Sequence, residues 1–468
     1  MEERSKLKQK YYNKILENYT SDIKNHNKNN KITFPHIETD IKIDEIFLKL
    51  NNSDKEYFME EFDIFVNSYN KHIAMITNRD LSNFEHSNAN TKHEVTKIIN
   101  EDSYTTTGKA ILTEIMSDEK HKQISDIFFW NKFKNDSAPA QRTPDWYRIR
   151  NESITASDCG TVLNQNKYEK QFGFIKKKVY GSVFETNYAC YWGKKYENAI
   201  NLMYEHINKV TICEFGLISS DTVKILAASP DGIVYPYHNG LPSPYAGRMI
   251  EIKCPITRKI NHTGMIKGDI CPIYYYCQIQ QQLHCCNLNE CDFVQCKIEA
   301  YNTKLEYIAD THETYDYFSK RTQKLRGVVI QKMPRKYHFD NYLNKIVPDE
   351  DIWNYADFIY PPKLTMTIKE TDEWIENEKN KLANDNEFYF HTVFYWYCSE
   401  MLTTLILRET DWIENNIKTL EKIWNYVIFL RENKVAFNEF ETYLSNLKIE
   451  NNTHVLKKLD EMILKSKK

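Results

Sequence analysis

The most constraining feature of the sequence is a short segment, MIEIKCP, at positions 249–255. Its side chains alternate in character with a period of two, which is typical of a β-strand. Ile250, Ile252 and Cys254 then share one face, and that face suits a protein core. Glu251 and Lys253 share the other face. The segment therefore predicts a strand that carries a carboxylate beside an ammonium group on one of its sides.

The segments around this strand predict an α/β fold. Apolar residues at helical spacing indicate helices, and alternating segments indicate strands. The expected order is two helices, the two strands of a hairpin, a third strand, a helix and a strand, over 151–163, 187–208, 209–219, 223–235, 247–255, 273–286 and 291–302. A further strand is expected near 401–409, with a long helix after it. This order favours a core of mixed β-sheet flanked by helices.

Composition limits where the protein acts and what it binds. The formal net charge of -3 offers no electrostatic argument for nucleic acid from the whole chain, so any site for a polyanion has to be local. Eleven cysteines, an odd and unevenly placed number, indicate reduced thiols inside a cell. No apolar run has the length of a membrane span, and the start of the sequence lacks the apolar segment of a secretory signal. We therefore expect an intracellular protein without a membrane partner.

A second carboxylate is expected beside Glu251. Asp231 stands in the turn sequence SPDG at the end of a preceding strand, and pairing of neighbouring strands brings it close to Glu251. Two carboxylates that converge are costly unless a cation lies between them. Oxygen atoms of Asp231, Glu251 and the Ile252 carbonyl suit Mg²⁺ or Mn²⁺. Lys253 would then orient a water molecule and stabilise negative charge on a phosphate.

This pattern resembles a known nuclease superfamily. An Asp, a variable gap and Glu-x-Lys are the signature of the PD-(D/E)xK nucleases. The segments QRTPDWYRIRNESITASDCGTVL, YWGKKYENAI, ASPDGIV, IEIKCP and YYCQIQQQL follow one another over about 141–301. Together they are similar to the λ-exonuclease-like, or YqaJ-type viral recombinase, family. The resemblance implies a restriction-endonuclease-like core and a metal-dependent exonuclease that digests double-stranded DNA from 5′ to 3′.

The resemblance also implies roles for residues outside the strand. Arg150 and Ser157 match the pair that binds the 5′-terminal phosphate. Glu197 matches a helical glutamate that contributes to the metal site or its surroundings. Gln278 matches the glutamine that holds the catalytic amine or the water. Gln280 remains an alternative to it.

Gln281 is a second alternative, because a run of glutamines leaves the register of the motif ambiguous. Local positive charge near the phosphate site comes from a set of basic residues that outnumber the acids around them: Arg142, Arg148, Lys167, Lys170, Lys176, Lys177 and Lys178.

The resemblance divides the chain into three predicted parts. Residues 1–136 are expected to form a helical accessory domain, in which we find no chemical motif. Residues 137–433 are expected to form the exonuclease domain, with an insertion at about 304–390. Residues 434–468 are expected to form a helical tail.

Family members work with a single-strand-annealing recombinase partner in recombination or repair, and the type member is a ring of subunits. We therefore expect such a partner and a homo-oligomer as possible assemblies. Relatives of similar added length in large DNA viruses imply a viral protein in the cytoplasm of an infected host cell.

Three alternatives stay open. One is a DNA-binding recombination scaffold with weak catalysis on the same fold. Another is a nuclease of the same superfamily that acts on RNA. The third is an iron-sulfur nuclease, suggested by a set of cysteines whose spacing lacks any C-x-x-C pair: Cys271, Cys277, Cys285, Cys286, Cys291 and Cys296.

Overall fold

A computed structural model describes scattered residues between 7 and 15, most residues from 34 to 66, and then 116–136, 143–181, 186–338, 346–447 and 452–466. These residues form two compact units. One contains the described residues up to 136 together with 235–247, and the other contains 143–234 and 248–466.

The first unit is helical, with one hairpin. Its helices include α3 (Pro35–Ile43), α4 (Glu45–Lys49) and α6 (Asp118–Asp136), and its hairpin pairs β6 (Tyr237–His238) with β7 (Leu241–Pro242). The ring of Tyr237 joins the apolar cluster of these helices. His121 Nε2 lies 2.8 Å from the carbonyl oxygen of Pro236. The helices were expected for this part of the sequence, but the contribution of the hairpin was not.

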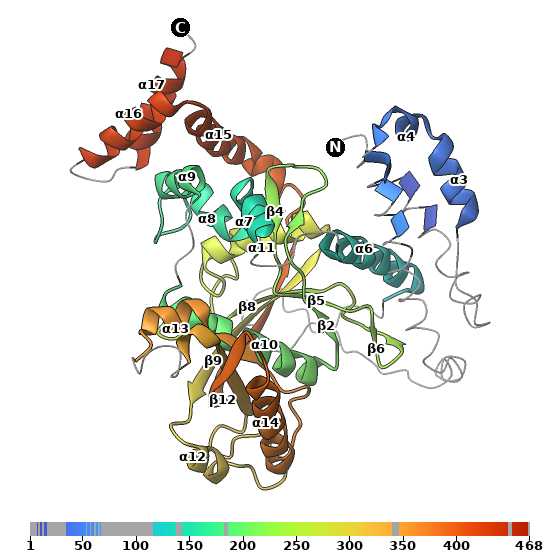
Figure 1. Cartoon of the computed structure of the whole chain (residues 1–468), viewed down its shortest axis with the longest axis vertical. Helices are drawn as coiled ribbons and strands as arrows, with labels where there is room; N and C mark the ends of the chain where they lie inside the picture. Colours follow the sequence, from blue (N-terminus) through green and yellow to red (C-terminus); the bar gives the residue numbers. More distant parts are fainter. Residues whose placement is uncertain are drawn as a thin grey trace. The chain divides into compact units, whose positions relative to one another are not determined.

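A mixed sheet forms the centre of the second unit (Figure 1). Over the described residues its seven strands follow the order β11-β10-β12-β9-β8-β5-β2. Only β8 and β9 run parallel, and all other neighbours are antiparallel. The strands are β2 (Ile212–Cys213), β5 (Gly232–Val234), β8 (Met249–Lys253), β9 (Glu290–Ala300), β10 (Arg326–Pro334), β11 (Asp357–Ile359) and β12 (Phe388–Leu407). The predicted α/β fold with a mixed sheet is confirmed.

The predicted hairpin of 209–219 and 223–235 is divided between two sheets. Near its turn, β3 (Ile218–Ser219) pairs with β4 (Leu226–Ala228) in a small sheet that also contains β1 (Ile154–Thr155). Further from the turn, β2 pairs with β5 in the large sheet. Pro230 lies in the break between β4 and β5, where its lack of an N–H group is tolerated. The break leaves the next residue, Asp231, at the start of β5.

Two helices cover opposite faces of the sheet (Figure 1). On one face, Tyr204 of α10 (Tyr188–Asn208) donates its hydroxyl to Asp292 of β9. On the other face, α11 (Ile273–Cys286) donates side-chain hydrogen bonds to Glu251 of β8. Asp292 pairs with Ile250 in the register of β8 and β9, so the apolar face of β8 lies toward α10 and the charged face toward α11. The two predicted helices are confirmed.

The predicted insertion adds strands to the sheet. It contains α12 (Lys304–Ala309), α13 (Asp349–Tyr355) and α14 (Ile368–Ala383), but also β10 and β11. β10 pairs with the first half of β12, and the strand expected at 401–409 is the second half of the same β12. The insertion therefore extends the sheet beyond the strands that the sequence indicated.

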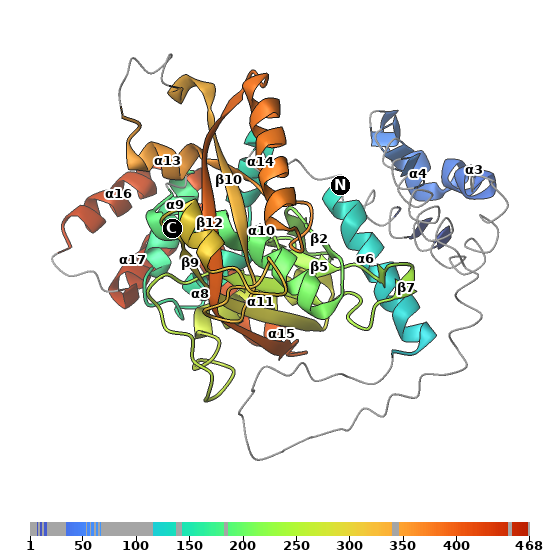
Figure 2. The same ribbon diagram turned by 90° about the horizontal axis from the view of Figure 1, so that it is seen from below.

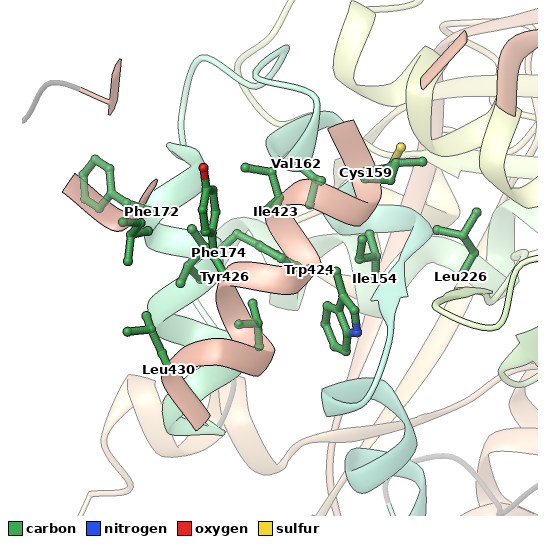
Figure 3. Packing of buried hydrophobic residues seen from close by; sticks show 14 of the residues in the cluster. Ile154, Cys159, Val162, Phe172, Phe174, Leu226, Ile423, Trp424, Tyr426 and Leu430 are labelled. Carbon is green, nitrogen blue, oxygen red and sulfur yellow. The ribbon is translucent and has the colours of Figure 1, made fainter. Parts of the chain in front are cut away.

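A helical layer packs beside the small sheet. It comprises α7 (Pro144–Asn151), α8 (Ala156–Val162), α9 (Gln171–Tyr180), α15 (Trp412–Glu432), α16 (Lys434–Ser445) and α17 (Asn452–Ser466). Figure 3 shows Ile423, Tyr426 and Leu430 of α15 beside Phe172 and Phe174 of α9. The same cluster of buried residues includes apolar side chains of α16 and α17. None of the helices described here is both long and apolar enough to span a membrane.

Candidate active site

The break before β5 brings Asp231 to the strand that carries Glu251. β5 and β8 are antiparallel with Gly232 opposite Ile250. The Ile252 amide donates a 2.7 Å hydrogen bond to Asp231 Oδ2. Gly232 is needed on the other side of β5, because a Cβ at that position would collide with the side chain of Ile212 in β2. The turn that contains Asp231 therefore lies next to the strand that carries Glu251, although the two are separate in the sequence.

Glu251 is fully buried and engaged by three side chains. Its Oε1 accepts hydrogen bonds from Lys253 Nζ and, at 2.6 Å, from Gln278 Nε2. Its Oε2 accepts a 2.8 Å hydrogen bond from Gln282 Nε2. The Lys253 side chain is 21% exposed, and its amine lies 4.7 Å from the ring centroid of Tyr275. Lys253 is therefore held at the surface end of a buried polar cluster.

The cluster has more negative than positive charge. Burial raises the pKa of Asp231 well above its ordinary value, and the charges of Glu251 and Glu197 raise it further, while Lys253 opposes them. Burial disfavours the charged form of Lys253, but the carboxylates of Glu251 and Asp231 outweigh this effect and raise its pKa. Lys253 accordingly stays an ammonium group, and the carboxylates still lack a full set of counter-charges.

A hard divalent cation fits this charge imbalance. Asp231 and Glu251 offer carboxylate oxygens, and the Ile252 carbonyl lies on the same strand. Glu197 of α10 is close enough to act on Asp231 electrostatically. Within the described ranges, no three His, Cys, Asp or Glu side chains converge closely enough to hold an ion on their own. These donors fit Mg²⁺ or Mn²⁺ in chemical type and charge, with water or a substrate oxygen completing the coordination.

Gln282 is a member of the cluster that the sequence analysis missed. It follows Gln278 by one helical turn, so both amides lie on the same face of α11. Its Nε2 lies 3.3 Å from the Ser229 carbonyl oxygen as well as close to Glu251. The spacing of four residues was the available signal, but the run of glutamines obscured it. Gln282 therefore connects the carboxylate of Glu251 to the irregular segment between β4 and β5, just before Asp231.

The two alternative glutamines make different contacts. Gln281 donates to the carbonyl oxygens of Ile154 at 2.8 Å and Ala227 at 3.1 Å, which joins α11 to the small sheet. Gln280 donates at 2.9 Å to the Leu407 carbonyl oxygen at the end of β12. Both therefore support the fold around the cluster, whereas Gln278 and Gln282 contact Glu251 directly.

Arg258 is a further charged residue near Lys253 that the sequence analysis did not identify. Its Nη1 donates a 2.8 Å hydrogen bond to Gln295 Oε1, and Gln295 is the partner of Lys253 in the register of β8 and β9. Its Nη2 is buried without a hydrogen-bond partner. A buried donor of this kind is costly unless it binds something. Arg258 therefore adds an available cationic donor close to the cluster.

The two residues predicted to bind a terminal phosphate lie on neighbouring helices. Ser157 is exposed near the start of α8, and its Oγ is 3.2 Å from Thr155 Oγ1. Arg150 is on α7, with its guanidinium carbon 4.6 Å from the ring centroid of Trp146. Burial lowers the pKa of Arg150, and the charge of Asp158 opposes that effect. Arg142 lies outside the described residues.

Asp158 organises the basic residues around this pair. Lys177 Nζ lies 2.6 Å from its Oδ1, Lys178 Nζ lies 3.0 Å from its Oδ2, and Thr155 donates a 2.8 Å hydrogen bond. Lys178 also donates to the Arg150 carbonyl oxygen at 2.7 Å. Burial disfavours the charge of Asp158, but Lys178 and Lys177 outweigh this and hold its pKa well below the ordinary value. Positively charged side chains therefore outnumber negatively charged ones around Asp158.

The eleven cysteines all lie in the described residues, are free thiols, and most are buried. Two of them, Cys296 and Cys398, contact each other, with their Sγ atoms 3.7 Å apart. In the described part of the chain, no group of three cysteines lies close enough together to hold a metal ion. The iron-sulfur alternative therefore receives no support.

Comparison with known proteins places this arrangement in a class. A family model described as the YqaJ-like viral recombinase domain matches residues 145–289. This segment contains Asp231, Glu251, Lys253 and the helix with Gln278. Residues 145–289 are therefore similar to the YqaJ-like viral recombinase domain, and the predicted family resemblance is confirmed over this segment.

The most informative relative is an uncharacterized protein of Acanthamoeba polyphaga mimivirus. It is 32% identical over 329 residues, which cover 69% of this chain and 59% of the relative. This chain thus spans about three fifths of the length of that relative.

Two solved structures of an alkaline exonuclease from Laribacter hongkongensis (LHK-Exo) are also similar. One match is 27% identical over 33% of this chain and 74% of the other, with a TM-score of 0.27. The other, LHK-Exo in complex with dAMP, is 17% identical over 63% of this chain and 100% of the other, with a TM-score of 0.33.

Proposed function

We propose that the protein is a divalent-metal-dependent exonuclease that hydrolyses double-stranded DNA from 5′ ends. The observation that carries the proposal is the meeting of Asp231, Glu251 and Lys253 at the β5 and β8 pair, with Glu251 held by Gln278 and Gln282. Two carboxylates and an amine that converge from neighbouring strands are the parts that phosphodiester hydrolysis requires.

Each residue of the site has its own role in the proposed reaction. Lys253 is a charged, partly exposed donor that stabilises negative charge on the scissile phosphate and orients the attacking water. Gln278 and Gln282 hold the Glu251 carboxylate, so it does not rotate away from Asp231. When bound, Mg²⁺ or Mn²⁺ supplies Lewis-acid activation of the water and the phosphate. Asp231, Glu251, the Ile252 carbonyl and Glu197 are the residues that would hold the ion.

The basic cluster supports a preference for 5′-phosphorylated ends. Arg150 and Ser157 offer a guanidinium and an exposed hydroxyl, and Lys177 and Lys178 add positive charge nearby. A guanidinium binds phosphate oxygens in a bidentate manner. A terminal-phosphate site beside the scissile bond favours release of nucleotides from an end over random internal cleavage.

The test is digestion of matched DNA substrates in Mg²⁺. A 5′-phosphorylated linear duplex is expected to be degraded, while the same plasmid as a closed circle is spared. Glu251→Gln should lack activity on both, and wild-type protein in EDTA should behave like that variant. Equal digestion of circle and linear duplex would contradict the exonuclease assignment and leave a nuclease.

The remaining alternatives are outcomes of the same assay. Digestion of RNA in preference to duplex DNA would identify an RNA-directed nuclease. Tight binding of duplex ends without cleavage in Mg²⁺ or Mn²⁺ would identify a recombination scaffold. A single-strand-annealing partner and a homo-oligomer belong to the same proposal, and co-purification and light scattering test them.

A further inference from the structure

Three tyrosine rings form a row that ends at the amine of Lys253. The ring centroids of Tyr168 and Tyr274 are 5.9 Å apart with edge-to-face geometry, and those of Tyr274 and Tyr275 are 4.3 Å apart. Lys167 Nζ lies 4.9 Å from the centroid of Tyr168, and Lys253 Nζ lies 4.7 Å from that of Tyr275. The row therefore runs from one ammonium group to another.

The fold holds the row in place. Tyr168 follows α8, whereas Tyr274 and Tyr275 begin α11, and the two helices lie side by side (Figure 2). Their approach depends on Gly160 of α8, where an added Cβ would lie 2.7 Å from the Cβ of Tyr274. Helices can pack this closely only where one of them lacks a side chain. The row is therefore a consequence of the packing of α8 on α11.

The rings are accessible as well as supported. Tyr168 is 71% exposed, and Tyr274 and Tyr275 are partly exposed. A single exposed aromatic residue is ordinary on a protein surface. A connected row of one exposed and two partly exposed rings with a lysine at each end is different, because it combines aromatic rings with cations at both ends.

We propose that this row is a base-stacking platform for unpaired nucleotides at the 5′ end of the digested DNA strand. The inference deepens the proposed exonuclease function and rests on it. Bases of any sequence stack on aromatic rings, while lysines contact the phosphates. Inside a duplex, neighbouring base pairs cover the faces of each base, so the rings engage bases that have left the duplex. The platform would lead such nucleotides toward Lys253.

The test measures binding alone, in an Asp231→Asn background that removes a proposed cation ligand but keeps a side-chain oxygen for the Ile252 amide. The probes are a 5′-phosphorylated duplex with a short 5′ overhang and the same duplex with abasic nucleotides in the overhang. Tyr168→Ala is expected to weaken binding of the normal overhang about 10-fold. It should leave the abasic overhang unaffected, because that overhang has no bases to stack. Tyr168→Trp should retain normal binding.

Tyr180→Ala is the matched control, since Tyr180 is 51% exposed and packs edge-on against another ring, that of Phe437. It should bind both probes normally. An equal loss for Tyr168→Ala on normal and abasic overhangs, or no loss on either, would overturn the stacking platform. Digestion of linear duplexes by the protein with native Asp231 is measured separately, so the nuclease proposal stands or fails independently.

Discussion

Two aspartates of the second unit have opposite electrostatic surroundings. Asp158 lies among cations, whereas Asp231 lies among other carboxylates. Asp158 of α8 pairs with two lysines of α9, and its pKa is held well below the ordinary value. Asp231 at the start of β5 shares one lysine with Glu251 and also feels Glu197, and its pKa is raised. Asp158 is therefore satisfied within the protein, whereas Asp231 is not.

The difference indicates that Asp158 has a structural role, whereas Asp231 belongs to a site that needs a bound cation. A buried carboxylate with a full set of partners stabilises its surroundings and needs no added ion. The guanidinium of Arg150 nearby adds positive charge that favours an anion. A carboxylate crowded by other carboxylates is stable only when a cation joins it. We expect the Asp158 region to attract phosphate and the Asp231 region to attract a metal ion.

The largest effect is expected at the lysine that the two carboxylates share. Lys253→Ala should lower the turnover rate on linear duplex DNA by on the order of 10³-fold, because it removes a donor to the transition state. Binding of DNA ends should change little. Lys267→Ala is the control, since Lys267 is an exposed lysine paired with Glu409. Turnover within a few-fold of wild type would contradict the role of Lys253.

The second effect concerns the stability of the protein, which substitutions of the two aspartates should change in opposite directions. Asp158→Asn should lower the free energy of unfolding by about 3 kcal/mol, because it leaves the buried ammonium of Lys178 without its counter-ion. Asp231→Asn should instead raise the melting temperature by about 2–4 °C, since it relieves repulsion from Glu251 and Glu197. Thermal unfolding without divalent ions measures both. An equal loss of stability in Asp158→Asn and Asp231→Asn would contradict the difference between the two aspartates.

The lowered pKa of Asp158 also predicts the direction of a pH effect. Its stabilisation is present above the pKa of an unfolded aspartate, about 3.9. It is lost as the pH falls through the lower folded pKa. The stability difference between wild type and Asp158→Asn should therefore shrink on acidification below about pH 4. Denaturant titrations at several pH values check this, and a pH-independent difference would argue against the ion pairs.

Magnesium should distinguish the same two residues. At a concentration 100 times the dissociation constant, a ligand of the folded state stabilises it by about 2.7 kcal/mol. Mg²⁺ should therefore raise the melting temperature of wild type and of Asp158→Asn, but not that of Asp231→Asn. Isothermal titration with Mg²⁺ or Mn²⁺ gives the affinity. An unchanged response in Asp231→Asn would place the ion elsewhere.

The smallest effect concerns the phosphate. Arg150→Ala should reduce the preference for 5′-phosphate over 5′-hydroxyl ends about 10-fold, as expected for the loss of one charged hydrogen-bonding partner. Arg148→Ala is a close control, because Arg148 lies on the same helix and is paired with Asp145 and Glu152. Rates on the two kinds of end provide the measurement, and an unaltered ratio would exclude Arg150 from phosphate recognition.

Some features were predictable because they depend on local pattern. Alternation in 249–255 predicted the two faces of β8, and helical spacing predicted α10 and α11. Other features depend on partners far along the chain. β10 received no prediction, although it pairs with β12 over its full length. The role of Gln282 was hidden in a run of similar residues, and only its contact with Glu251 distinguishes it.

The sequence alone determined the residue types of the site, the alternation of β8 and the family of residues 145–289, because these are properties of short segments and their order. The tertiary structure alone decided that Asp231 reaches the backbone of Ile252, that Asp158 collects two lysines, and that three tyrosines line up beside Lys253. Such contacts join positions separated by tens of residues. Their geometry follows from strand register and helix packing, which no local pattern specifies.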